Sequence, residues 1–369
     1  MTTHTDLHQI REQRGVSAAQ LAKLTGVSRQ TIYSIEAGEY VPNTALALQL
    51  ARILEVRVED LFKLEAESAP PPKPVPVELL ESHGHQGQPV QVCRVGKRAI
   101  GIAASAQPLV LPPADGVVVG SSGHTAKVQM FPAEPEPSRR LLIAGCDPGI
   151  SLLAQHLGRF EDIDLIVAPS SSLRALEWLK RGMVHVAGTH LRDTSSGEYN
   201  LPAIHRVFGK SHVKVVTFAI WEQGLVVAPG NPKHIRAAED LARRGVHIIN
   251  RESGAGSRDL LDERLKAAGI AHASVQGYDR IALGHLAAAL AVSRKEADCC
   301  IATRSAARAF GLSFVPLATE RYDLVVTREF ARNAAVQALF DVLSRSSVRR
   351  KLETLAGYDT SHTGEVLVA

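Results

Sequence analysis

Residues 17–38 read SAAQLAKLTGVSRQTIYSIEAG, and this stretch decides the fold of the first part of the chain. Its apolar residues recur at helical spacing on two short segments: Leu21, Ala22 and Leu24, then Ile32 and Ile35. Between the segments, Gly26 stands where a tight turn needs a residue that accepts a positive φ. Val27 fills the corner, and Ser28 can cap the second segment. The stretch therefore predicts a helix-turn-helix, an arrangement that places its second helix in the major groove of DNA.

The second predicted helix turns polar side chains outward. Their hydroxyls, amide and guanidinium offer donors and acceptors that suit base edges and phosphates. The predicted DNA-binding residues are Ser28, Arg29, Gln30, Thr31, Tyr33 and Ser34.

Apolar positions on both sides of this stretch predict further helices, so that residues 5–62 form a five-helix domain. The segment resembles the Cro/CI-type (XRE) family of repressor domains, through the run LA..TGVS..TI..IE.G and a short closing helix over 58–62. The resemblance implies that Arg11 and Glu36 form a structural pair.

The same resemblance assigns base reading to Arg29, Gln30 and Ser34, and places Ser28 near a phosphate. The chain departs from the family at Ala18, a position that often carries a polar base-contacting residue. Fewer polar side chains are therefore left for base readout.

Charge on this domain predicts the number of copies that bind. Residues 1–64 hold seven Lys or Arg and seven Asp or Glu, so their net charge is zero. A neutral domain has little sequence-independent attraction to the phosphate backbone, and one copy should bind weakly. We therefore expect a homodimer or a higher homo-oligomer on a symmetric operator in double-stranded DNA.

Composition places the whole chain among globular proteins of two or three domains, because 45% of its 369 residues are hydrophobic and 22% are charged. No stretch approaches a membrane span, and the first residues do not read as a signal peptide. Four cysteines, at positions 93, 146, 299 and 300, follow no metal or disulfide spacing. We expect a cytoplasmic protein with reduced thiols, no cofactor and no membrane partner, in which Cys299 and Cys300 pack in a core.

Proline-rich segments divide the chain. Residues 65–89 read as a linker after the DNA-binding domain of residues 1–64, with His83 and His85 in its polar part. Residues 90–131 alternate apolar and polar positions around Gly and Pro, which predicts a small region of short β-strands that packs on a neighbour or mediates dimer contact. A second proline-rich break covers 132–137.

From residue 139 to 369 the chain turns to a regular alternation of strands and helices. We expect strands over 141–144, 163–167 and 184–187, with helices between them, as in a doubly wound α/β domain. The segment lacks GxGxxG and GxxxxGK[ST], which argues against nucleotide binding.

Three loops of this domain place small or hydroxyl residues at a helix N-terminus, where free N–H groups and the helix dipole favour an anion. They supply Cys146 and Asp147, then Ser170, Ser171 and Ser172, then Ser253, Gly254, Gly256, Ser257 and Arg258. Arg251 or Arg258 offers a charged fork for an oxyanion. Together the loops predict a ligand-binding cleft.

Residues 139 to about 330 resemble the periplasmic-binding-protein-like domain that occurs fused to molybdenum-cofactor enzymes and to cytoplasmic regulators. The matching runs are 187–191, 197–200, 222–225, 229–232, 250–262, 307–312 and 320–324. The resemblance implies a type II, two-lobed clamp with its ligand between the lobes, where serines, backbone amides and arginine bind tetrahedral oxyanions. The family's Gly-Ser-His-Asp loop is Gly145-Cys146-Asp147 here, and Asp147 suits a bare anion only if it points away.

Further candidate ligand residues follow from the same resemblance. Thr189 and His190 lie at the crossover between lobes, where His190 either hydrogen-bonds the ligand or is a structural hinge residue. Tyr199 and Asn200 end a polar loop that either lines the cleft or does not. His285 opens an alanine-rich helix and either reaches the cleft or caps the helix.

The whole chain thus predicts a multidomain protein: an all-α helix-turn-helix head, a small β segment and a two-lobed α/β domain. We expect the protein to be a one-component transcriptional regulator whose clamp senses a small anion. Molybdate or tungstate is the preferred ligand. The alternative ligand is a molybdopterin-related or other small organic molecule. Two weaker alternatives for the function are an enzyme that uses the cleft and a DNA-binding controller without a ligand. No HExxH-type cluster and no local base beside Cys146 are visible, so we expect no catalytic or metal-binding residues.

Overall fold

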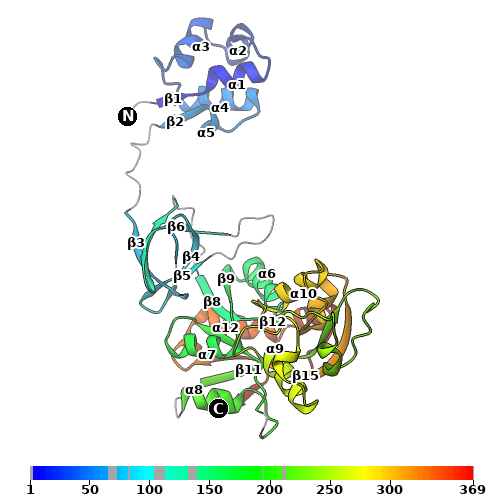
Figure 1. Cartoon of the computed structure of the whole chain (residues 1–369). Helices are drawn as coiled ribbons and strands as arrows, with labels where there is room; N and C mark the ends of the chain where they lie inside the picture. Colours follow the sequence, from blue (N-terminus) through cyan, green and yellow to red (C-terminus); the bar gives the residue numbers. More distant parts are fainter. Residues whose placement is uncertain are drawn as a thin grey trace. The chain divides into compact units, whose positions relative to one another are not determined.

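A computed structural model describes residues 3–64, 73–81, 84–103, 113–131, 139–193, 195–209 and 213–368. The chain divides into two compact units, Met1–Pro72 and Lys73–Ala369 (Figure 1). Among the described residues, no helix combines the length and the apolar character that a bilayer crossing needs.

The first unit, which we call the head, contains the five predicted helices. They are α1 (Leu7–Gln13), α2 (Ala18–Thr25), α3 (Arg29–Glu36), α4 (Thr44–Leu54) and α5 (Val58–Leu61). An antiparallel pair of short strands that the sequence did not predict, β1 (Thr3–Thr5) and β2 (Phe62–Leu64), joins the two ends of the head.

Local signals in the sequence fix the helix-turn-helix. Ser17 and Gln20 form a reciprocal capping box at the start of α2, and Gly26 ends this helix with φ 72°. The Ser28 side chain caps α3 by accepting from the Thr31 backbone N–H. Ile32 and Ile35 are fully buried as predicted, whereas Leu24 is 64% exposed and lies outside the core. The apolar face of α2 is therefore narrower than its sequence predicts.

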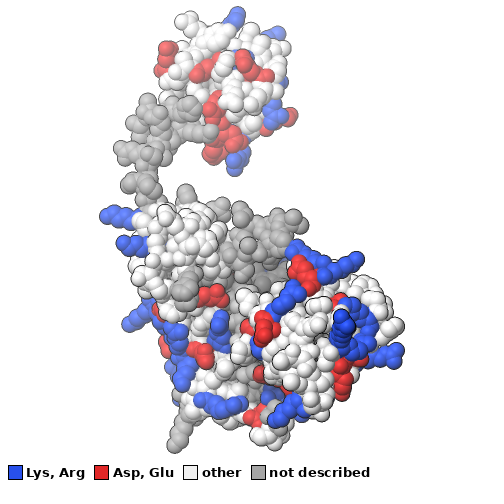
Figure 2. Space-filling model, viewed as in Figure 1, with Lys and Arg blue, Asp and Glu red and all other residues white. Residues whose placement is uncertain are grey.

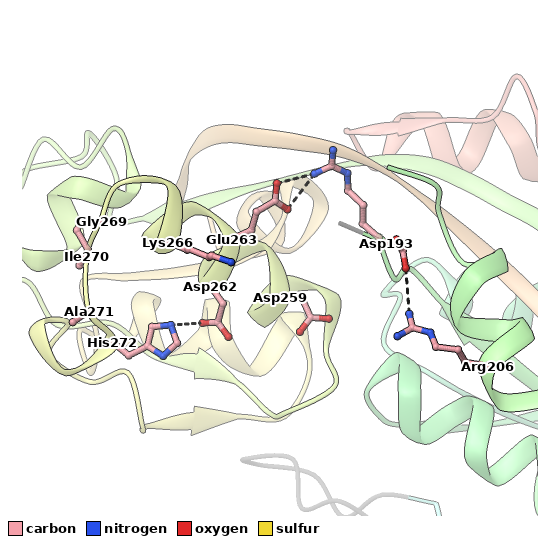
Figure 3. Close-up of a pocket in the computed structure, with 11 residues that line it drawn as sticks. Asp193, Arg206, Asp259, Asp262, Glu263, Lys266, Gly269, Ile270, Ala271 and His272 are labelled. Carbon is pink, nitrogen blue, oxygen red and sulfur yellow. Dashed lines mark hydrogen bonds and ion pairs between the residues drawn. The ribbon is translucent and has the colours of Figure 1, made fainter. Parts of the chain in front are cut away.

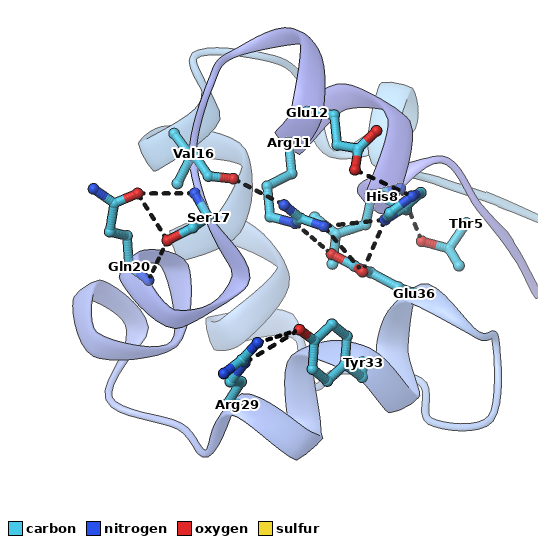
Figure 4. Close-up of polar contacts among 11 residues, drawn as sticks. Thr5, His8, Arg11, Glu12, Val16, Ser17, Gln20, Arg29, Tyr33 and Glu36 are labelled. Carbon is cyan, nitrogen blue, oxygen red and sulfur yellow. Dashed lines mark hydrogen bonds and ion pairs between the residues drawn. The ribbon is translucent and has the colours of Figure 1, made fainter.

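Arg11 and Glu36 form the pair that the family resemblance implied (Figure 4). Arg11 Nε donates to Glu36 Oε1 at 2.6 Å, and its Nη1 donates to the Val16 carbonyl at 2.9 Å. Both side chains are less than one-tenth exposed. The pair thereby ties α1 to the end of α3 and fixes the angle of the recognition helix.

Glu36→Ala is expected to destabilise the head by about 3 kcal/mol, because it leaves the buried Arg11 charge without its partner. Native-state hydrogen exchange of the full chain reads this loss separately in the helices of the head. Glu12→Ala, at a side chain that is 62% exposed, is the matched control. Equal protection of the head in both variants would refute the structural role of the pair.

The second unit begins with a closed five-stranded barrel. Its strands are β3 (Val75–Leu79), β4 (Pro89–Val95), β5 (Arg98–Ala103), β6 (Gly116–Ser122) and β7 (Thr125–Met130). The linker predicted over 65–89 is therefore too long, because β3 pairs with β5 and β7 and belongs to the barrel. Residues 65–72 of that linker, His83 and the break at 132–137 lie outside the described residues.

The barrel packs on the α/β domain, one of the two roles that the sequence allowed for this region. Cys93 and Ile100 of the barrel share one buried cluster with Leu142 and Leu176 of the α/β domain. Arg140 adds a bidentate ion pair to Asp115, with distances of 2.7 and 2.9 Å. The barrel is thus anchored to the first of the two lobes described next.

The α/β domain is built on an eight-stranded mixed sheet, with strand order β14-β11-β15-β10-β8-β9 and with β16 and β17 paired to β11. The first lobe contains β8 (Arg139–Gly145), α6 (Ile150–Phe160), β9 (Ile163–Pro169), α7 (Ser172–Lys180), β10 (Val186–Thr189), α8 (Leu201–Phe208), η3 (Phe330–Arg332), α12 (Ala334–Leu343), α13 (Ser346–Thr354), β16 (Tyr358–Asp359) and β17 (Val366–Val368). The second lobe contains η1 (Ala238–Ala242), β12 (Asn250–Arg251), α9 (Gly256–Ala267), η2 (His272–Ser274), β13 (Ile281–Ala282), α10 (His285–Ser293), β14 (Cys299–Thr303) and α11 (Arg304–Ala309).

Two long antiparallel strands, β11 (Val213–Val227) and β15 (Ser313–Thr327), pass through both lobes. Separate buried clusters cover the two sheet faces in each lobe, so each lobe has its own core. Cys299 and Cys300 are buried in β14, as predicted. The lobes therefore meet around the middle of β11 and β15, where the register of the pair shifts.

Candidate functional site

The recognition helix α3 exposes most of the predicted DNA-binding residues. Ser28, Arg29, Gln30 and Tyr33 are exposed, and Thr31 and Ser34 are half-buried. Arg29 Nη2 donates to the Tyr33 hydroxyl at 2.8 Å, which holds the guanidinium along the outer face of the helix (Figure 4). Both basic and acidic side chains occur on the visible face of the head (Figure 2), in line with its net charge of zero.

The second candidate site lies where the two lobes of the α/β domain meet. The loop before α9 contacts the loop before α7, because Leu173 N–H donates to the Gly254 carbonyl at 3.3 Å. Gly256 lies so close to His190 that an added Cβ would stand 2.7 Å from His190 Nδ1. The structure thus brings the predicted loops from both lobes together at one buried junction, which we call the cleft.

Three buried donors in these loops find no hydrogen-bond partner among the described residues: Ser170 Oγ, Ser257 Oγ and Arg251 Nη1. Ser170 N–H bonds to the Gly145 carbonyl, next to Cys146, while Ser257 follows Gly256 at the start of α9. Arg251 is 1% exposed, and its Nε and Nη2 bind Glu252 at 2.9 and 3.0 Å. Buried donors without a partner cost stability, so a bound molecule or ordered water is needed to satisfy them.

Cys146 and His190 form the centre of the cleft. Cys146 Sγ lies 3.3 Å from His190 Nε2, and Glu320 Oε2 on β15 lies 2.8 Å from His190 Nδ1. Burial opposes the protonated ring, but the adjacent Cys146 and Glu320 together raise the pKa of His190 to about 10. The Gln223 amide on β11 completes this group by donating to Glu320. The imidazole thus lies between a sulfur and a carboxylate, both of which favour its protonated form.

His285 joins this centre from the second lobe. Its ring centroid lies 5.7 Å from that of His190, and Trp221 packs edge-on against both rings. Burial, together with the charges of Arg251 and His190, lowers the pKa of His285 well below its ordinary value. The sequence left open whether His285 reaches the cleft or caps α10. In the structure it reaches the cleft, and its side chain does not cap the helix.

Asp147 is turned toward the C-terminal part of the first lobe. Its Oδ1 accepts from the Tyr358 hydroxyl at 2.7 Å and from the Gly149 N–H. Burial raises the pKa of Asp147 to about 7, although these two hydrogen bonds favour the carboxylate. Asp147 therefore carries less negative charge near neutral pH than an exposed aspartate would.

Tyr322 supports the Cys146 loop from below. Its hydroxyl lies 3.3 Å from the Cys146 backbone N–H, and it occupies the space beside Gly145 and Gly188. A Cβ at either glycine would overlap the Tyr322 hydroxyl, so both positions need a residue without a side chain.

Several predicted ligand residues have their polar atoms engaged by the protein itself. Asn200 accepts from the Leu191 N–H and donates to Asp323, and the Thr189 hydroxyl bonds to Asn200. The Tyr199 hydroxyl donates to the Thr319 carbonyl. These contacts give the three residues structural roles near the crossover, and we do not carry them into the proposed site.

Three further residues of the predicted loops are also engaged elsewhere. Ser171 caps α7, and the Ser172 hydroxyl accepts from the His190 N–H. Arg258 stacks on the Tyr278 ring at 4.9 Å, so Arg251 supplies the charged fork. Ser253 is exposed.

An open groove between the lobes was not predicted from the sequence (Figure 3). Asp193 and Arg206 of the first lobe lie on one side, and Asp259, Asp262 and Lys266 of the second lobe lie on the other. Arg192 Nη1 bridges the groove to the Glu263 carboxylate at 2.8 and 3.1 Å. This exposed pair fastens the lobes outside the cleft, and its charged lining distinguishes the groove from the buried donors within.

The arrangement of Cys146, His190, Glu320 and His285 also lay beyond the sequence analysis, which found no base for Cys146 and no metal-binding residues. These side chains come from both lobes and from a crossing strand, and His190 and Glu320 stand 130 positions apart. Only the histidine and cysteine residue types gave a signal, and no spacing connects them.

Comparisons with known proteins agree with this architecture. A family model described as the PBP superfamily domain matches residues 154–344, and a helix-turn-helix model matches residues 7–61. The protein YvgK of Bacillus subtilis is 34% identical over 243 residues, which cover 66% of this chain and 78% of YvgK. The HTH-type transcriptional regulator YgzD of the same organism is 40% identical over 60 residues, 16% of this chain and 91% of YgzD.

Among solved structures, the chain is similar to the tungstate ABC transporter from Geobacter sulfurreducens. The TM-score is 0.45 at 16% sequence identity, and the match covers 58% of this chain and 98% of that one.

Proposed function

The chain belongs to the family of the PBP superfamily domain and carries a helix-turn-helix domain before it, and from this premise we propose a one-component transcriptional regulator that senses a small anion. The anion binds in the cleft between the lobes, and operator DNA binds to the head. We further propose that two copies act together and that the protein works in the cytoplasm, where its DNA partner is found.

The unpartnered donors in the cleft carry this proposal. Ser170 Oγ and Ser257 Oγ offer hydroxyls from opposite lobes, and Arg251 Nη1 offers a guanidinium N–H. An oxyanion accepts from all three at once, and hydrogen bonds to a charged acceptor contribute more than neutral ones. The protonated His190 adds positive charge to the same cleft. Since these donors come from both lobes, binding stabilises the closed clamp.

Molybdate or tungstate is the ligand that we propose first, because the family resemblance and the hydroxyl-rich loops agree on a tetrahedral oxyanion. Asp147 no longer opposes this choice, since its Oδ1 is occupied by Tyr358 and Gly149. A molybdopterin-related or other small organic anion is the alternative. It would explain the Asp147 Oδ2 atom, which lacks a partner among the described residues.

The architecture supports a route from ligand to DNA. Closure moves the second lobe against the first, to which the barrel is anchored through Arg140 and the shared core. In a two-copy assembly this movement changes the spacing of the two heads, and ligand affinity and DNA affinity become linked. The linkage is reciprocal, so operator DNA shifts ligand affinity by the same factor.

Molybdate and tungstate are expected to raise the melting temperature of the full chain, and sulfate and phosphate to raise it less. A ligand that binds only the folded state adds about 2.7 kcal/mol of stability at 100 times its Kd. Ser170→Ala combined with Ser257→Ala is expected to remove most of this shift, because each lost hydrogen bond to an anion costs about 1.5–3 kcal/mol. Thermal unfolding of the metal-free protein against the four anions measures both effects.

Ser171→Ala is the matched control, since its hydroxyl caps α7 and does not face the cleft unpartnered. It should lower the melting temperature without ligand while keeping the shift. Retention of the full shift in the Ser170/Ser257 double variant would move the anion elsewhere. A wild-type chain that responds to none of the four anions would favour the organic ligand.

A further inference from the structure

The centre of the cleft holds three side chains that suit a transition-metal ion. Cys146 Sγ, one ring nitrogen of His190 and one of His285 all lie within 4.8 Å of one another. We propose that Cys146, His190 and His285 bind a thiophilic divalent cation, of which Zn²⁺ is the chief candidate. This site lies beyond the anion-sensing function and is independent of it.

The distances fit such an ion. Tetrahedral Zn²⁺ with bonds of about 2.3 Å to sulfur and 2.0–2.1 Å to nitrogen places ligand atoms roughly 3.3–3.6 Å apart. Cys146 Sγ and His190 Nε2 already stand at 3.3 Å. All three ligand atoms lie within 4.8 Å of one another, so metal binding requires the outermost pair to approach by at most about 1.5 Å.

The unpartnered His285 ring is the second observation that points to a ligand. The residue is 1% exposed, and neither of its ring nitrogens finds a hydrogen-bond partner in the described part of the chain. A buried imidazole with both nitrogens unsatisfied is costly unless something binds one of them. A cation held also by Cys146 and His190 provides that partner, and its binding releases the proton of His190 Nε2 and that of the Cys146 thiol to solvent.

Glu320 orients His190 for this role. Its Oε2 lies 2.8 Å from His190 Nδ1, which turns Nε2 toward Cys146 Sγ. A carboxylate behind a histidine is the arrangement that fixes the ring and raises the basicity of the metal-binding nitrogen. A metal ion can reach the site from solvent through Cys146, because this residue is partly exposed while the two histidines are buried.

Three protein ligands leave a fourth position on a tetrahedral ion. The buried Arg251 guanidinium pairs with Glu252 at 2.9 Å and keeps Nη1 without a partner among the described residues. The fourth position is therefore open to an anion or to water. Only the assignment of an anion to this fourth position rests on the proposed function, because it places the sensed anion and the metal ion in the same cleft.

The test uses the full chain, reduced and freed of metal, titrated with Co²⁺ and then with Zn²⁺. We expect one Co²⁺ per chain, a sulfur-to-cobalt charge-transfer absorption, and displacement by Zn²⁺. Cys146→Ser should remove the absorption, and Glu320→Gln should weaken binding about 10- to 100-fold, as for other partners behind a metal ligand. His285→Gln should weaken binding without lowering the melting temperature of the metal-free chain.

Cys93→Ala is the matched control, because this buried cysteine belongs to the barrel. It should keep the absorption unchanged. Failure of the wild-type chain to bind either ion, or an equal absorption in Cys146→Ser, would overturn the site. The anion shift of the metal-free protein is measured separately. A wild-type chain that binds no metal but keeps the anion-induced rise in melting temperature refutes only the metal site. A chain that binds metal but shows no such rise refutes only the proposed anion.

Discussion

Gly256→Ala weakens ligand binding by roughly 5- to 150-fold, the effect of about 1–3 kcal/mol of steric strain on closure. The added Cβ would overlap the His190 carbonyl oxygen and stand 2.7 Å from His190 Nδ1, across the lobe boundary. Backbone cannot yield as a flexible side chain does, so the lobes must separate. Each lobe keeps its own core, and the variant should therefore fold.

Calorimetric titration with whichever of the four anions stabilises the wild-type chain most checks this result. Gly158→Ala in α6 is the control, because its nearest neighbour, the Ile163 carbonyl oxygen, lies at 3.9 Å. That substitution should leave the affinity unchanged. Wild-type affinity in Gly256→Ala would show that ligand binding does not need the closed arrangement.

Arg29→Ala removes sequence-specific DNA binding while leaving the anion shift intact. A bidentate contact from an arginine to a base contributes about 1–3 kcal/mol of discrimination, and two copies on a symmetric operator double it. Arg29 is exposed on α3, as such a contact requires, and its guanidinium donates to the Tyr33 hydroxyl. Binding to the operator and to an unrelated duplex, each at two salt concentrations, measures the discrimination.

Arg52→Ala, which removes an equal charge from the exposed side of α4, is the matched control. It should weaken both duplexes alike, if it weakens them at all, and keep their ratio. An unchanged operator preference in Arg29→Ala would transfer base reading to other residues of the helix.

The head was predictable in detail because its signals are local. Ser17, Gly26 and Ser28 each act within three or four residues of their own position, as caps or as a turn. Leu24 shows the limit of a local pattern, since its helical spacing predicts a core position although its side chain is 64% exposed.

The barrel was predicted less well because its first strand, β3, begins in a proline-rich stretch. Pro76 lies inside β3, where it pairs with Lys127, and the sequence around it reads as a linker. Proline in a sheet is normally confined to edges and strand ends, so the pattern favoured an extended segment without partners. Closure of the barrel depends on contacts between strands that are distant in sequence.

Within the cleft, the hydroxyls and Arg251 were predictable because helix N-termini leave a sequence pattern. The group around His190 was not. Its members meet only through the pairing of β11 with β15, and that pairing is a property of the folded sheet. Asn200 was predicted to bind the ligand although its polar atoms form hydrogen bonds within the protein. A sequence does not show which polar groups the protein itself uses.

The packing of Tyr322 between two glycines limits how this protein can change over evolutionary time. An alanine at position 188 would meet not only the hydroxyl but also the ring of Tyr322, with Cε1 at 2.8 Å, so phenylalanine at position 322 does not relieve it. A smaller residue must replace Tyr322 before Gly145 or Gly188 can be replaced by a residue with a side chain. A lineage that makes the substitutions in the other order passes through an intermediate in which the new side chain overlaps Tyr322. These three positions should therefore diverge together or stay fixed, whatever anion the clamp comes to bind.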